Sequence, residues 1–513
     1  MSTPAIELKN VTKRFGSVIA NDNVNLTLEQ GEILSILGEN GSGKTTLMNM
    51  LSGIYYPDEG QIFVGGREVS IQSPKDSFEL GIGMIHQHFK LIDVLSAAEN
   101  IILGLQGEEI LKMQEVYAKI NELTAKYGFD LDPKEKIYNM SVSQKQTVEI
   151  VKVLYRGADM LILDEPTAVL TPQEIQKLFT VLRNMRQAGK SIIIITHKLN
   201  EVMELSDRVA VLRKGRYIGC VETAKTSISE LTEMMVGEKI SLDIHRSQPQ
   251  DAHKRIEMRG ITVRNKEGVR MLNKASFVAN SGEILGIAGV AGSGQKELLE
   301  AIAGLQETET GGEILYYAPT GETLKLTEMT AENIRNLGIH LSFVPEDRLG
   351  MGLVGSMDLT DNMMIRSYRE TGHFFAHRKA PRELAEQIVE KLDVVTPGVD
   401  TPISHLSGGN VQKMLVGREI AAQPIVLMVA YPVRGLDINS SYTIYNLLNE
   451  QKEKGVAVIC VGEDIDVLLA LCDRIMVMSG GNITGVVDAK STTKEEIGLM
   501  MTGATKEKAD HES

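Results

Sequence analysis

The sequence has few cysteines. Only Cys220, Cys460 and Cys472 occur among 513 residues, and no two of them form a C-x-x-C pair. An odd number of thiols without paired spacing gives no disulfide framework and suits a reducing compartment. We expect each cysteine to be a buried structural thiol.

The sequence also lacks an excess of basic residues and any long apolar run. The net charge is −14 and the pI about 5.4, so the basic footprint of a nucleic-acid-binding protein is missing. Apolar runs such as Ser191–Thr196 are far shorter than the roughly 18 residues that span a bilayer. The N-terminal residues MSTPAIELKN show no basic segment followed by an apolar one, as a secretory signal would. We therefore expect a cytosolic protein that meets a membrane only through a partner.

One pattern occurs twice along the chain. Gly31–Leu34 and Gly282–Leu285 both read GEIL, and each is followed by an apolar run and a glycine-rich turn. Ser206–Gly219 (SDRVAVLRKGRYIG) likewise matches Cys472–Gly485 (CDRIMVMSGGNITG). A repeat of this extent predicts two similar domains joined by a polar linker and followed by a polar, disordered tail. The predicted boundaries are 1–238 for the first domain, 239–255 for the linker, 256–502 for the second domain and 503–513 for the tail.

Each half alternates short β-branched runs with helical patterns, which is typical of a mostly parallel sheet. The middle of each half, about 90–140 and 350–405, is more helical. We therefore predict an α/β fold in which a helical subdomain is inserted into each sheet core. The predicted strands include Met160–Leu163, Ile192–Thr196 and Val456–Val461, and the predicted crossover helices are Gln173–Ala188 and Tyr442–Lys454.

A glycine-rich loop predicts a phosphate-binding cradle. Gly38–Thr45 reads GENGSGKT, which satisfies G-x-x-x-x-G-K-[ST] between a strand and a helix. The glycines let consecutive N–H groups face an anion, and the helix N-terminus adds the positive end of its dipole. Lys44 would contact the β- and γ-phosphates of ATP, and the Thr45 hydroxyl would bind Mg²⁺. The predicted nucleotide-binding residues of this loop are Gly38, Glu39, Asn40, Gly41, Ser42, Gly43, Lys44, Thr45 and Thr46.

Polar residues follow three further strands. After the apolar run MLIL, Asp164 suits Mg²⁺ through water, and Glu165 suits the general base that activates the attacking water. His197 follows SIIIIT, where a contact to the γ-phosphate is favoured over a structural role. Gln87, in GMIHQHF, lies where an amide can orient water or Mg²⁺. The predicted catalytic set is Lys44, Gln87, Glu165 and His197, and the predicted metal set is Thr45, Gln87 and Asp164.

Phe15 and two histidines can be interpreted either as functional or as purely structural residues. Phe15 precedes the phosphate loop and can stack on adenine through its π-face, or it can lie in the core. His86 and His88 flank Gln87, but a strand would point both rings to one face without a third ligand. We expect no metal site at these histidines.

The motifs together resemble the ATP-binding cassette (ABC) family over both halves. The resemblance rests on GENGSGKT, Gln87, LILDEP, His197 and the LSGGN of Leu406–Asn410. The tandem form, with VPEDR at Val344–Arg348, is similar to the ATP-binding subunits of bacterial importers for simple sugars and nucleosides. Ile82–Ile101 is closest to the nucleoside branch.

The resemblance implies two tandem P-loop ATPase domains that face each other head to tail, with each ATP between the phosphate loop of one half and the LSGGN-like signature of the other. The first site would combine the motifs above with Ser407, Gly408, Gly409, Asn410 and Asp437 of the second half. Nothing would be missing from the first site except that Asn410 replaces the usual glutamine. The second site would carry the other substitutions: Gln295, Lys296, Ala430, Tyr431 and Glu463 from the second half, and Val142, Ser143 and Thr171 from the first. Because the substitutions all fall on one site, we expect only the other to hydrolyse ATP.

The family resemblance also implies ATP and Mg²⁺, two transmembrane permease subunits and, through the complex, an extracytoplasmic solute-binding protein. The chain would lie at the cytoplasmic face of the membrane and bind no nucleic acid. The permease helices would be received near Phe89–Asn100 and Arg348–Asn362, with Gln87 and Glu346 at the roots of this surface. Nucleosides, ribose and galactose all fit as solutes.

Two other interpretations remain open. One is a tandem ABC protein that acts on ribosomes or nucleic acid, against which the acidic balance, the asymmetric sites and the short linker argue. The other is a nucleotide sensor without turnover, against which the complete first-half set of Lys44, Glu165 and His197 argues.

Overall fold

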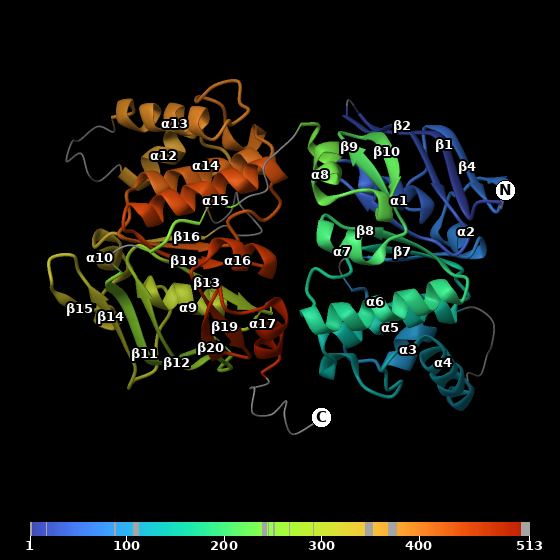
Figure 1. Ribbon diagram of the computed structural model, residues 1–513, viewed down its shortest axis with the longest axis horizontal. Coiled ribbons are helices and arrows are strands. Elements are labelled where there is room, and N and C mark those ends of the chain that lie inside the picture. Colours follow the sequence, from blue (N-terminus) through green and yellow to red (C-terminus); the bar gives the residue numbers. More distant parts are fainter. Residues whose placement is uncertain are drawn as a thin grey trace. The chain divides into compact units, whose positions relative to one another are not determined.

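The computed structural model in Figure 1 divides the chain into two compact units, Met1–Ser241 and Leu242–Ser513. It describes residues 3–16, 18–86, 89–105, 112–238, 244, 246–249, 252–265, 267–290, 292–343, 352–367 and 377–503.

The first unit contains two sheets. A six-stranded sheet has the order β10-β9-β3-β8-β7-β6 and is parallel except for β10, and an antiparallel four-stranded sheet has the order β2-β1-β4-β5. The strands are β1 Ile6–Phe15, β2 Val18–Leu28, β3 Ile33–Leu37, β4 Glu59–Val64, β5 Arg67–Val69, β6 Ile82–Ile85, β7 Met160–Asp164, β8 Ser191–Ile195, β9 Arg208–Arg213 and β10 Arg216–Glu222. The helices are α1 Lys44–Leu51, α2 Pro74–Glu79, α3 Ala97–Ile102, α4 Met113–Tyr127, α5 Val142–Tyr155, α6 Pro172–Gln187, α7 Leu199–Leu205 and α8 Ile228–Val236, with 3-10 turns at Ile137–Asn139 and Thr223–Lys225.

The second unit repeats this plan. Its sheets have the orders β16-β17-β18-β13-β19-β20, parallel except for β20, and β12-β11-β14-β15, antiparallel. The strands are β11 Lys254–Arg264, β12 Arg270–Asn280, β13 Ile284–Gly289, β14 Glu313–Tyr317, β15 Thr323–Lys325, β16 Ile339–Phe343, β17 Val426–Ala430, β18 Ala457–Val461, β19 Arg474–Ser479 and β20 Asn482–Asp488. The helices are α9 Gln295–Ile302, α10 Ala331–Asn336, α12 Leu359–Ser367, α13 Lys379–Lys391, α14 Gly408–Ala421, α15 Ile438–Glu453, α16 Ile465–Leu471 and α17 Lys494–Met501, with 3-10 turns at Leu326–Glu328 and Ile403–His405.

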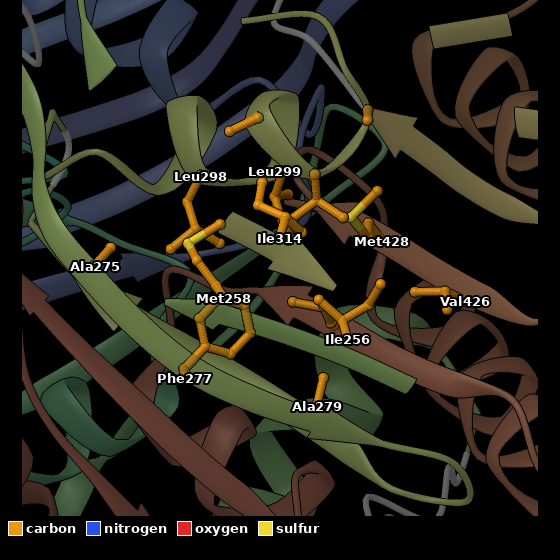
Figure 2. Close-up of a cluster of buried hydrophobic side chains, with 14 of the residues drawn as sticks. Ile256, Met258, Ala275, Phe277, Ala279, Leu298, Leu299, Ile314, Val426 and Met428 are labelled. Atoms are coloured by element: carbon orange, nitrogen blue, oxygen red, sulfur yellow. The ribbon is translucent and has the colours of Figure 1, made fainter. Parts of the chain in front are cut away.

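The helix after each glycine-rich turn lies in the core between the two sheets. In the second unit, Leu298 and Leu299 of α9 share one apolar cluster with Phe277 of the antiparallel sheet and Met428 of the parallel sheet (Figure 2). In the first unit, Leu47 and the other apolar side chains of α1 share a cluster with strands of both sheets. Each of these helices is therefore packed on two sides.

A separate helical subdomain sits in each unit. In Figure 1, α3 and α4 lie against α5, and the three helices share their own apolar cluster. The second unit has the corresponding cluster on α12, α13 and α14. The predicted α/β fold, with a mostly parallel sheet and an inserted helical subdomain in each half, is confirmed.

The structure starts α15 earlier than the sequence pattern predicts. The prediction placed its start at Tyr442, whereas the helix begins at Ile438 because Asp437 caps it, accepting the Ser440 N–H at 2.7 Å. An N-cap aspartate satisfies an otherwise unpaired helical N–H group.

Part of the predicted linker packs on the second unit. Ile244 lies against the cluster that contains Leu468, and Arg246 donates to the carbonyls of Leu469 and Cys472 at the end of α16. Strand β11 begins at Lys254, inside the predicted linker. The polar stretch is therefore partly held by the second unit.

The three cysteines are free thiols. Cys460 and Cys472 are buried, whereas Cys220 is only half-buried, contrary to the prediction that all three are buried. Burial raises the pKa of Cys460 to about 12, so this thiol stays protonated at neutral pH.

Candidate functional site

The glycine-rich loop of the first unit forms an open helix N-terminus. Gly43 precedes α1 in the left-handed region (φ 94°), and no side chain caps the helix. A Cβ on Gly43 would lie 2.4 Å from the Ala20 carbonyl oxygen, and one on Gly38 would lie 2.3 Å from that of Leu212. The first N–H groups of α1 therefore remain available to an anion.

A cavity of about 530 Å³ opens beside this loop. The structure brings Asp164 and Glu165, from the end of β7, to the same cavity as the loop residues 40–46. Its remaining walls are Val18–Ala20, Ile195 and Lys214–Gly215. These wall residues were not predicted. The sequence carries no local signal for them, although Val18 is 62% exposed in the structure.

Lys44 is held inside the loop. Its Nζ donates to the carbonyl oxygens of Gly38 at 2.7 Å and Glu39 at 2.9 Å. Burial lowers the pKa of Lys44, and the nearby charges of Glu165 and Asp164 oppose that shift. These two hydrogen bonds thus hold the lysine side chain against the loop, and Lys44 still lines the cavity with its positive charge.

Asp164 and Thr45 form a pair suited to a cation. The Thr45 hydroxyl donates a long hydrogen bond of 3.4 Å to Asp164 Oδ2. Burial and the charge of Glu165 raise the pKa of Asp164 to about 6, which Lys44 and Thr45 only partly offset. Ionising Asp164 beside Glu165 is costly because two negative charges then lie close together. A divalent cation would compensate both charges, so this arrangement suits one.

Glu165 and His197 meet at the adjoining strand ends. Glu165 Oε1 lies 2.8 Å from His197 Nδ1, and the Glu165 N–H donates to the Ile195 carbonyl at 2.9 Å. Burial raises the pKa of Glu165, but His197, Lys44 and Lys198 together outweigh it, so the pKa is lowered overall. Glu165 is therefore an ionised carboxylate oriented by an imidazole, as a general base requires.

Phe15 is not in the core. Its side chain is 43% exposed at the end of β1, and its ring lies edge-on to Tyr55 with the centroids 5.1 Å apart. The exposed ring is on the same hairpin as Val18 and Ile19, which line the cavity. This placement excludes the buried alternative and leaves a face for an adenine ring.

The structure describes only some of the predicted residues around Gln87. Gln87, His88 and Glu346 lie outside the described residues. His86 follows β6, and burial followed by the charge of Lys90 lowers its pKa. Within the described ranges, no group of three or more His, Cys, Asp or Glu side chains could hold a metal ion.

The signature residues begin α14 in the second unit. Ser407 caps this helix, and its hydroxyl accepts the Asn410 N–H at 3.4 Å and the Asn410 side-chain amide at 3.0 Å. The Asn410 carboxamide also bonds both the N–H and the carbonyl of Val395, each at 3.2 Å. Gly408 and Gly409 form the exposed or half-exposed first turn. Asp437 caps α15, which the sequence did not indicate.

The second unit keeps the backbone of the first site with other side chains. Gly294 precedes α9 with φ 96° and ψ 7°, close to the 94° and 3° of Gly43. Gln295 replaces the lysine and donates to the Val290 carbonyl at 3.0 Å. Tyr431 stands in the place of Glu165, and Arg434 pairs with Glu463 at 3.4 Å beside it.

Comparison with known proteins identifies the family of the chain. The family model described as ABC transporter matches residues 21–168 and 272–432. The nucleoside import ATP-binding protein of Lactococcus lactis is 40% identical over 97% of this chain and 98% of its own length. The guanosine import ATP-binding protein of Bacillus subtilis is 40% identical over 98% of each chain, and a ribose import ATP-binding protein of Rubrobacter xylanophilus is 36% identical over 98% and 99%.

The matches cover both units and include the cradle, β7 and their second-unit counterparts. The resemblance to tandem ATP-binding subunits is thereby confirmed. The chain belongs to the ABC transporter family and is one of its ATP-hydrolysing subunits.

Proposed function

We propose that this chain drives a bacterial importer of a nucleoside or simple sugar by hydrolysing ATP at one complete site. The observation that supports this most directly is the Glu165–His197 pair at the cavity, for which the second unit has Tyr431 and Glu463. Burial raises the pKa of Tyr431, so its hydroxyl stays protonated at neutral pH and cannot accept a proton from water.

The chemistry follows from these residues. Glu165 accepts a proton from a water molecule whose oxygen attacks the γ-phosphorus, and the bond to the ADP oxygen breaks, giving ADP and phosphate. Lys44 stabilises the charge that develops on the phosphoryl oxygens, and His197 keeps Glu165 oriented. Thr45 and Asp164, with Gln87 from outside the described residues, would hold Mg²⁺, which neutralises phosphate charge when bound.

The second unit would complete the site. We infer that Ser407, Gly408, Gly409 and Asn410 contact the γ-phosphate when the halves close on ATP, with Asp437 beside them. Asn410 donates two hydrogen bonds to the Ser407 oxygen and so uses both of its lone pairs. The Ser407 hydroxyl proton is therefore available to an anion. Loss of the γ-phosphate would remove this contact and let the halves separate. The reciprocal site, with Val142, Ser143 and Thr171, would not turn over.

The partners would be two transmembrane permease subunits and, through them, an extracytoplasmic solute-binding protein. In the described part of the chain, no helix is both long and apolar enough to cross a membrane. The segment after Gln87 exposes Val94 (70%) and Ile92 (44%), apolar side chains that suit contact with permease helices at the cytoplasmic membrane face. Two relatives named above import nucleosides or guanosine, which favours a nucleoside as the solute.

The experiment is reconstitution. The chain and its permease subunits, placed in vesicles with the solute-binding protein, should hydrolyse ATP faster when a nucleoside is present than when ribose or galactose is present. If only ribose stimulated hydrolysis, the solute would be a simple sugar and the nucleoside proposal would be wrong. Co-purification with ribosomes and no permease would favour the ribosome-acting alternative instead.

A further inference from the structure

The turn between β9 and β10 places a lysine at the nucleotide cavity. Lys214 and Gly215 connect these strands, and both line the cavity. Both residues are in the left-handed region, with φ 49° for Lys214 and 80° for Gly215. Two-residue hairpins of this kind favour asparagine, aspartate or glycine at the first position, since other side chains are strained there. Nothing in the turn itself therefore accounts for a lysine.

The turn is clamped where the phosphate loop meets β2. The Gly215 N–H donates to the Ser42 carbonyl at 3.1 Å, and the Gly215 carbonyl accepts the Asp22 N–H at 2.8 Å. A Cβ on Gly215 would lie 2.9 Å from the Ala20 carbonyl oxygen, so the turn packs closely on β2. Val18, Lys44 and Gly215 line the same cavity, so a nucleotide with its base toward Val18 and its γ-phosphate at Lys44 would pass this junction with its inner phosphates.

The charge of Lys214 is not used elsewhere in the described chain. Arg216, on the far side of the turn, pairs with Asp22 at 2.8 Å. Lys44, the other cation of the cavity wall, is bound to loop carbonyls. Lys214 is exposed and has no ion pair with any described residue, so its ammonium group is available to a ligand in the cavity.

The second unit has the same turn without the lysine. Gly480 and Gly481 take the two positions with φ 51° and 80°, and the Gly481 N–H donates to the Ser293 carbonyl at 3.2 Å. The cation is therefore absent from the unit that has also replaced Lys44 by Gln295. Glycine relieves the backbone strain, and only the first unit keeps the strained residue.

We propose that Lys214 binds the α-phosphate of ATP and ADP and holds the nucleotide between the base wall and the cradle. The proposal rests on nucleotide binding at the first-unit cradle. A lysine on a flexible stem acts as a point charge, so it should contribute to affinity for any nucleotide that carries this phosphate.

The test compares Lys214→Gly with Lys214→Arg in the full chain. Glycine matches the second unit and removes backbone strain, so the variant should fold. We expect Lys214→Gly to weaken ADP binding about fivefold and to raise the KM for ATP by the same factor. A change of this size is expected when one exposed contact between charged groups is lost. Inhibition by AMP should weaken equally, inhibition by adenosine should not, and Lys214→Arg should restore most of the loss.

Gly480→Lys is the matched control, and it should leave ADP affinity within twofold of the wild type. ADP binding that is unchanged in Lys214→Gly, a loss confined to ATP, or an equal change in Gly480→Lys would each overturn the proposal. A wild-type chain that binds no nucleotide at all would instead contradict the proposed function.

Discussion

The two units share one backbone around the nucleotide site but differ in its chemistry. Glu165 and Tyr431 follow equivalent strands, both in the left-handed region with φ 47° and 53°. Their N–H groups donate to Ile195 and Val461 at 2.9 Å in each case. Because a tyrosine keeps the same conformation where the first unit has a glutamate, the turn does not depend on the carboxylate. The side chain at this position could therefore be replaced without loss of the fold.

The replacement side chains have their own partners. Gln295 donates to a carbonyl of its loop as Lys44 does, but to one carbonyl in place of two and without a charge. Arg434 pairs with Glu463 and lies over the Tyr431 ring, 5.9 Å from its centroid. The side chain that takes the place of Lys44 is therefore uncharged, and the side chains beside Tyr431 form an ion pair.

The largest effect should come from the base. Glu165→Gln should slow hydrolysis about 10²–10⁴-fold while ATP still binds, because the amide cannot take the proton from water. Tyr431→Phe, the matched change in the second unit, should stay within twofold. Phosphate release and ATP binding measured on both variants check this. Near-normal release from Glu165→Gln would remove this carboxylate from the mechanism.

The two cradles can be compared in the same way. Lys44→Ala removes a charge aimed at the phosphoryl group and should cost about 3–4 kcal/mol of transition-state stabilisation. Gln295→Ala should change hydrolysis less than about threefold, or ~0.6 kcal/mol. Steady-state kcat and KM decide between them, and equal losses would mean that both units share the chemistry.

The two signatures provide a test of the proposed head-to-tail site. Gly408→Asp puts a carboxylate at the N-terminus of α14, where like charge would repel the γ-phosphate, so turnover should fall about 10²-fold. ATP binding to the first-unit cradle should persist. Val142→Asp, in the other signature, should be much milder. The reverse ranking of these variants would show that each half uses its own signature.

The smallest effect concerns the stability of the ligand-free protein. The folded-state pKa of Asp164, about 6, lies above its ordinary value of 3.8, so ionisation is more costly in the folded state. The resulting destabilisation is absent below about pH 4, grows as the pH rises, and is complete above about pH 6. Asp164→Asn should therefore stabilise the Mg²⁺-free chain by about 1–2 kcal/mol at pH 7.5 and not at pH 4.

Thermal melting at both pH values measures the difference between Asp164→Asn and the wild type. No equivalent gain is available at Ala430, the second-unit counterpart, because the charge is already absent there. A variant that melts like the wild type at pH 7.5 would show that Asp164 is ionised without cost.

The sequence by itself determined the repeat, the strand and helix types, and the identity of most site side chains. These features depend on short-range signals: the glycines of GENGSGKT, the acids after MLIL and the periodicity of α6. The boundaries shifted by a few residues where a cap such as Asp437 intervened, because capping depends on backbone geometry at one position.

Only the tertiary structure decided how the distant groups meet. The pairing of Glu165 with His197 and of Thr45 with Asp164 depends on strand order in the parallel sheet, which the sequence pattern does not specify. The exposure of Phe15 and the wall formed by Val18, Ile19 and Lys214 depend on how the antiparallel hairpin and the β9–β10 turn pack on the loop. Such contacts join residues far apart in the chain, so no local signal could have located them.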